Sequence, residues 1–182
     1  MAQITEERAY NGARDRIERL GLGPLIDEVR EILTGFELRV LEEKDKNGGA
    51  ALRELIDARF LAAGNWRKAQ TGAVDWIKCL VINGSRLCVG VEIQVSARSD
   101  LLIMDIVHLR KRITDGLIDL GILVVPSDRL AVYLTDRAPS MADAVRHVDQ
   151  ARADDLPLLL IALEHDGPGN ALPKRRKRTA KE

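Results

Sequence analysis

The chain has 182 residues, of which 46% are hydrophobic and 31% are charged, a balance typical of one soluble globular domain with a sizeable core. Aromatic residues make up 3%, which argues against nucleic-acid binding on a platform of stacked aromatic rings. The longest apolar run, "LPLLLIAL", is too short to cross a bilayer, and no charged-then-apolar leader opens the chain. We therefore expect no membrane span and a reducing, cytoplasmic location.

The formal net charge of zero hides an asymmetry along the chain. The segment Lys174–Glu182 carries six basic residues against one acid, so the rest of the chain is acidic overall. An acidic body argues against broad nonspecific binding of nucleic acid, but it does not exclude a cleft with concentrated positive charge. We expect residues 1–167 to form a single domain and residues 168–182 to form a basic, disordered tail.

Hydrophobic spacing and turn signals predict a series of helices and strands. The order suits an α/β fold in which a mixed central sheet is flanked by helices on both faces, although many α/β domains share it. In chain order we expect helices at Ile4–Leu20 and Pro24–Leu33, a strand at Phe36–Leu41, a helix at Gly49–Ala63, a β-hairpin at Val74–Ser96, a helix at Asp100–Leu120, strands at Ile122–Pro126 and Leu130–Leu134, a helix at Ser140–Ala153 and a strand at Leu158–Leu163.

The segment "VDWIKCLVINGSRLCVGVEIQVS", Val74–Ser96, is the most informative part of the chain. Asn83-Gly84 is the dipeptide preferred in two-residue hairpin turns, so residues whose numbers sum to 167 should face each other. Cys79 then faces Cys88, and Asp75 faces Glu92. One face of the hairpin is apolar apart from one lysine and should lie on the core, whereas the acids share the opposite, water-accessible face.

Asp75 and Glu92 would hold their Cβ atoms roughly 5 Å apart across the hairpin. Two carboxylates held so close repel each other, and a divalent cation is the usual remedy. Gly90, beside them, should leave open space on the same face. The alternative is that both acids are ordinary solvent-facing strand residues, and Gln94 could equally be a surface residue.

This pattern resembles the catalytic motif of the PD-(D/E)XK nucleases, in which an acid on one strand pairs with an acid-x-lysine on the next. Gln94 replaces the lysine, and "VEIQVSARSDLLIMDIVHLRKRITDGLIDLGILVVP" resembles the BglII-type branch of type II restriction endonucleases. The resemblance implies Asp75, Glu92 and Gln94 as catalytic residues. It also implies a Mg²⁺ ion held by the two carboxylates and the carbonyl of Ile93.

The same resemblance implies site-specific hydrolysis of double-stranded DNA by a restriction-endonuclease-like domain that acts as a homodimer, since two-fold DNA symmetry favours a symmetric dimer. Ser96 and Arg98 follow the motif and are candidate DNA contacts. Two alternatives stay open, which are a catalytically weak or inactive DNA-binding protein on this fold and an unrelated α/β interaction module. Cys79 and Cys88 are expected to be a reduced pair of small hydrophobic residues and not a disulfide. Two cysteines without neighbouring histidines make no zinc site.

Overall fold

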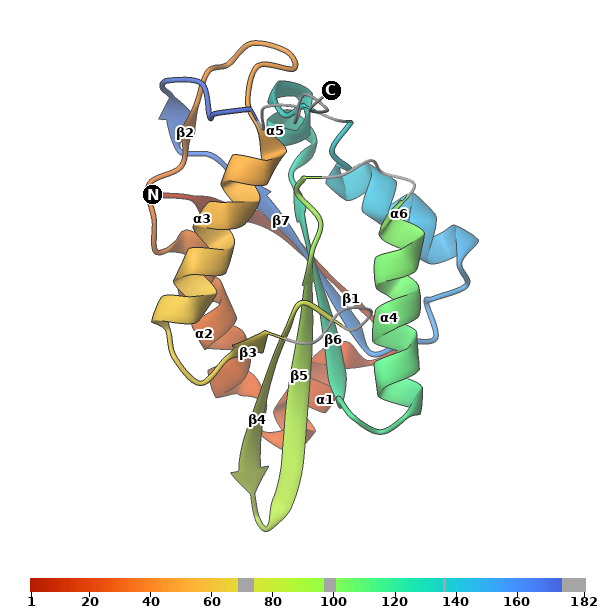
Figure 1. Ribbon diagram of the computed structural model, residues 1–182. Helices are drawn as coiled ribbons and strands as arrows, with labels where there is room; N and C mark the ends of the chain where they lie inside the picture. The colour runs from red at the N-terminus through yellow and green to blue at the C-terminus, as the bar shows by residue number, and fades with distance from the viewer. Residues whose placement is uncertain (69–73, 97–100, 136, 175–182) are drawn as a thin grey trace, which may run out of the picture.

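The computed structural model describes residues 1–68, 74–96, 101–135 and 137–174 of the chain. A central sheet is covered by helices on both faces (Figure 1), which confirms the predicted fold class. The strands are β1 (Gln3–Tyr10), β2 (Arg39–Val40), β3 (Arg67–Lys68), β4 (Trp76–Ile82), β5 (Ser85–Ile93), β6 (Leu120–Pro126), β7 (Leu158–Glu164) and β8 (Gly167–Pro168). The helices are α1 (Ala13–Leu20), α2 (Gly23–Thr34), α3 (Gly49–Ala62), α4 (Leu102–Thr114), α5 (Asp128–Tyr133) and α6 (Met141–Gln150).

The main sheet has six strands in the order β1-β7-β6-β5-β4-β3, and β2 pairs with β8 in a separate two-stranded sheet. Strands β5, β6 and β7 are parallel to one another, whereas β1, β4 and β3 pair antiparallel. The carboxyl ends of the three parallel strands therefore meet at one edge of the sheet. Every residue of β6 and β7 is buried, as expected for strands covered on both faces.

Two hydrophobic clusters lie on the two faces of the sheet. One cluster packs α2 and α3 against residues that include Trp76, Val91 and Ile93. The other packs α4 and α6 against residues that include Cys88 and Leu160. Strand β5 therefore lies between α3, on one face of the sheet, and α4, on the other (Figure 1).

The hairpin has the predicted register, with Ile82 opposite Ser85, Cys79 opposite Cys88 and Trp76 opposite Val91. Asn83 has a φ of 51°, as a two-residue hairpin turn requires. The expectation of a reduced cysteine pair is wrong, because Cys79 and Cys88 are joined in a disulfide.

Gly90 has no open space above it, contrary to the expectation from sequence. A Cβ atom there would lie 2.7 Å from a methyl group of Ile118 and 3.3 Å from one of Val74. Glycine is needed because the chain after α4 and the segment before β4 cross this point of β5 closely.

The first predicted helix, Ile4–Leu20, is wrong over its first half. Residues 3–10 form β1, which pairs along its length with β7, and a turn with positive φ at Asn11 and Gly12 separates β1 from α1. The glutamates and arginines of this segment favour a helix locally, but β7, which is apolar up to its last residue Glu164, needs a partner on its outer edge. Tertiary pairing therefore overrides local propensity.

Other elements also differ from the prediction, and the strand expected over Phe36–Leu41 is limited to Arg39–Val40. The helix expected over Asp100–Leu120 ends at Thr114, because the chain turns at Gly116 with a φ of 68°, and Leu120 already belongs to β6. The strand expected over Leu130–Leu134 is instead part of α5, whose N-cap Ser127 accepts a hydrogen bond from the Leu130 backbone N–H.

The chain beyond β7 continues on the folded body. Strand β8 pairs with β2, and the backbone N–H of Leu172 donates to the side-chain oxygen of Asn47. Residues 168–172 are therefore a packed extension, while the basic residues 175–182 lie outside the described part of the chain. Among the described residues, none of the helices combines the length and apolar character that a bilayer crossing requires.

Candidate active site

The acidic face of the hairpin is covered, not open to water as the sequence suggested. Glu92, near the carboxyl end of β5, is 3% exposed, because α4 packs over this face with Leu102, Ile106 and Leu109 in its core cluster. A carboxylate buried this deeply requires charged or hydrogen-bonding partners. The partners of Glu92 come from β4 and from α4.

Asp75 immediately precedes β4 and reaches across to β5. Its Oδ2 accepts a hydrogen bond of 2.8 Å from the backbone N–H of Ile93, and its carboxyl group also hydrogen-bonds to that of Glu92. Its Oδ1 lies 2.6 Å from Nη2 of Arg53 on α3. The two acids that the register placed opposite each other are therefore in contact.

Helix α3 approaches β5 through a glycine. A Cβ atom at Gly49 would lie 2.4 Å from the carbonyl oxygen of Val95, so the first residue of α3 meets the chain just beyond β5. One helical turn later, Arg53 points at the end of β5 and donates a 2.7 Å hydrogen bond from Nη1 to the carbonyl oxygen of Ile93. Sequence analysis did not identify Arg53.

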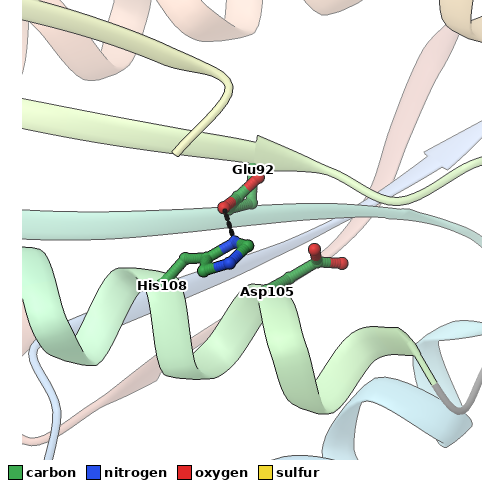
Figure 2. A group of neighbouring side chains, drawn as sticks. All are labelled: Glu92, Asp105 and His108. Carbon is green, nitrogen blue, oxygen red and sulfur yellow. Dashed lines mark hydrogen bonds and ion pairs between the residues drawn. The ribbon is translucent and has the colours of Figure 1, made fainter. Parts of the chain in front are cut away.

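Helix α4 contributes Asp105 and His108 on the side that faces β5 (Figure 2). His108 Nδ1 lies 3.2 Å from Glu92 Oε1, and one ligand atom from each of Glu92, Asp105 and His108 lies within 4.8 Å of the others. Oδ2 of Asp105 is buried and has no hydrogen-bond partner among the described residues. An orphaned carboxylate oxygen beside two further ligand groups fits a divalent cation.

The pKa values of Glu92 and Asp105 are higher than those of ordinary surface carboxylates. Burial and the adjacent Asp75 raise the pKa of Glu92 well above its usual range. Burial, with a smaller contribution from Asp75, raises the pKa of Asp105 to about 7. In the absence of a cation both groups therefore tend to hold a proton, and a bound cation would replace it.

The other predicted residues have different positions. Gln94 is 8% exposed, and its Nε2 atom has no hydrogen-bond partner within the described ranges, so it is not an ordinary surface residue. Ser96 is half-buried near the start of α3, where its Cα would lie 2.9 Å from a Cβ added at Gly49. Arg98 lies outside the described residues.

The residues that sequence analysis missed carry a weak signal in the chain. Asp105 and His108 are three residues apart, which places them on one side of a helix. Each immediately precedes a buried apolar residue, Ile106 and Leu109 respectively. This spacing would have identified them if α4 had been expected to pack on the acidic face. Arg53 carries no such signal, because its role depends on how closely Gly49 lets α3 approach.

The raised pKa of Asp105 predicts how stability depends on pH. Between about pH 4 and about pH 7 the unfolded chain ionises at this residue while the folded protein keeps the proton, so the free energy of unfolding should fall as the pH rises. Asp105→Asn removes this dependence. Between about pH 4 and about pH 7, its free energy of unfolding relative to that of wild type should increase by roughly 2 kcal/mol, a value reduced to allow for the partial exposure of Asp105. Urea denaturation at several pH values in EDTA measures it.

The matched control is Asp115→Asn, which removes an exposed acid just after α4. Its stability should follow the wild-type curve across the same pH range. If Asp105→Asn also ran parallel to wild type, the buried, protonated state of Asp105 would be wrong.

Comparison with known proteins gives an independent result. No curated protein sequence matches the chain. The family model described as "Restriction endonuclease BglII/BglIII" matches residues 6–163, a range that contains the hairpin and every described residue of the site. The chain therefore belongs to the BglII/BglIII restriction endonuclease family and is a nuclease that acts on DNA.

Proposed function

We propose that the protein is a Mg²⁺-dependent, site-specific endonuclease of double-stranded DNA, with Asp75, Glu92 and Gln94 at its catalytic centre. The observation that carries the proposal is the contact between Asp75 and Glu92 at the end of β5, where the carbonyl of Ile93, joined to Asp75 through Arg53, offers a third oxygen. Mg²⁺ takes hard oxygen ligands of this kind.

Two ligand sets share Glu92. The first is the motif set of Asp75, Glu92 and the Ile93 carbonyl, and the second joins Glu92 to Asp105 and His108. When bound, a divalent cation supplies charge neutralisation at the scissile phosphate and acidifies a coordinated water. The imidazole of His108 suits a transition metal better than Mg²⁺, so we assign Mg²⁺ to the motif set.

Gln94 occupies the position that holds lysine in the wider superfamily. Its carboxamide can orient water by hydrogen bonds, but it cannot share a positive charge with the phosphate or take up a proton. Its Nε2 atom, which has no hydrogen-bond partner in the described part of the chain, is consistent with such a role. We further propose that Ser96 and Arg98 contact the DNA, and that the protein acts in the cytoplasm.

The carboxylates provide the first test of this proposal. Asp75→Asn and Glu92→Gln keep the shape of each side chain and remove its charge, so each should lower Mg²⁺-dependent plasmid cleavage by at least about 10²-fold while the fold is retained. Circular dichroism checks folding. Glu54→Gln, an exposed acid on α3, should cleave as wild type does. Cleavage near the wild-type rate by either site variant would refute the metal-site assignment.

Gln94 provides a second test. Gln94→Ala should lose more cleavage activity than DNA binding, because it removes the group that orients water. Gln94→Lys should also lower activity, since an ammonium in this buried position displaces its neighbours, and a shift of about 1 Å in the attacking water can cost ~10²-fold. Single-turnover cleavage across a Mg²⁺ titration, with DNA binding measured in Ca²⁺, separates the two effects. Wild-type rates in Gln94→Ala would exclude Gln94 from the site.

We also propose that the protein forms a homodimer, because α4 carries an exposed apolar stripe. Ile103, Met104 and Val107 share one side of the helix, and each remains exposed although large and hydrophobic. The stripe lies on the same helix as Asp105 and His108. Dimerisation through it would bring two active sites near each other on a two-fold symmetric duplex.

Light scattering after size-exclusion chromatography tests the dimer. Wild type should elute as a dimer, and Met104→Glu should elute as a folded monomer because it places a charge in the apolar stripe. Leu61→Glu, a matched change at an exposed leucine on α3, should remain dimeric. A monomeric wild type, or a dimeric Met104→Glu, would contradict the interface.

A further inference from the structure

Arg53 makes three contacts, two of which are to groups of the proposed metal site. Its Nη1 donates to the Ile93 carbonyl oxygen at 2.7 Å, its Nη2 lies 2.6 Å from Asp75 Oδ1, and its Nε lies 3.0 Å from Asp57 Oδ1. One guanidinium therefore joins two of the three groups assigned to the metal. A planar, forked cation suits this bridging, and its charge is permanent.

The guanidinium of Arg53 is also fixed by Asp57, which is itself hydrogen-bonded to its neighbours. Asp57 accepts hydrogen bonds of 2.9 Å from the indole N–H of Trp76 and from Nζ of Lys68. Trp76 is fully buried and stacks on Phe60 with ring centroids 5.3 Å apart. Asp57 is thus tied to the core through Trp76 and keeps Arg53 directed at the end of β5.

We infer that Arg53 is a positioning residue that holds Asp75 and the Ile93 carbonyl together in the metal-free protein, and that a divalent cation competes with it for these two groups. This inference rests on the proposed metal site. Its physical basis is that two cations on one carboxylate oxygen repel each other strongly in a partly buried place. Binding of the metal therefore requires the guanidinium to release at least one of its contacts.

The inference makes a prediction opposite to that of a purely structural role. If Arg53 did no more than orient Asp75, its removal would disorder a ligand and weaken metal binding. If Arg53 competes with the metal, its removal frees two ligands and takes away an opposing charge, so metal binding becomes tighter. The sign of the change in affinity therefore distinguishes the two roles.

The test is a calorimetric titration of the full-length protein with Mn²⁺, used in place of Mg²⁺. Wild type and every variant carry His108→Ala in this test, so that the second ligand set does not take the ion. Arg53→Gln should bind Mn²⁺ roughly tenfold more tightly than wild type. Without metal, its melting temperature should be lower than that of wild type, and the rise on adding Mn²⁺ should be larger. Arg59→Gln, an exposed arginine on the same helix, should bind as wild type does.

A second variant keeps the test decisive if Arg53→Gln is too unstable to titrate. Arg53→Lys keeps the charge but cannot bridge both ligands with a rigid fork, so its affinity for Mn²⁺ should lie above that of wild type. Unchanged or weaker binding in the folded Arg53 variants would overturn the inference. Loss of the metal site itself has a different signature, because Asp75→Asn would then bind Mn²⁺ as tightly as wild type.

Discussion

The burial of carboxylates at the carboxyl end of β5 is the constraint on which the site depends. Glu92 lies under α4 and touches Asp75, so like charges would meet in a place with little water. Such a cluster is stable only with protons or cations among its members. The guanidinium of Arg53 supplies a cation, and the raised pKa of Asp105 keeps a proton in the cluster, while Nδ1 of His108 lies within hydrogen-bond distance of Glu92.

Two glycines allow neighbouring segments to pack closely against β5 and the chain just beyond it. Gly49 lets the start of α3 touch the chain beyond β5, and Gly90 lets Ile118, after α4, cross the opposite face. Because both neighbours are backbone or well-packed side chains, a larger residue at either position would push an element away from β5. The positions of Arg53 and of the carboxylates at the end of β5 therefore depend on the packing at these two glycines.

The sequence predicts the fold where local signals agree with tertiary packing. The Asn83-Gly84 turn and the alternation of apolar residues were enough to derive the register that brings Asp75 to Glu92. They could not reveal that α4 covers the acidic face, since nothing local in the chain records which face a distant helix takes. The same limit explains β1, where pairing with β7 overrides the helical preference of its glutamates and arginines.

Gln94, which we propose as a site residue, stands where the PD-(D/E)XK pattern has lysine, and its burial offers a physical reason for the difference. Gln94 is almost fully buried, and an ammonium in its place would lose its hydration and would need hydrogen-bond acceptors. The positive charge near Asp75 comes instead from Arg53 on α3, a side chain that Asp57 holds and that also donates a hydrogen bond to the Ile93 carbonyl of β5. A cation carried on a separate helix can move without disturbing the strand. This separation allows the charge to yield to a metal while Asp75 and Glu92 keep their places.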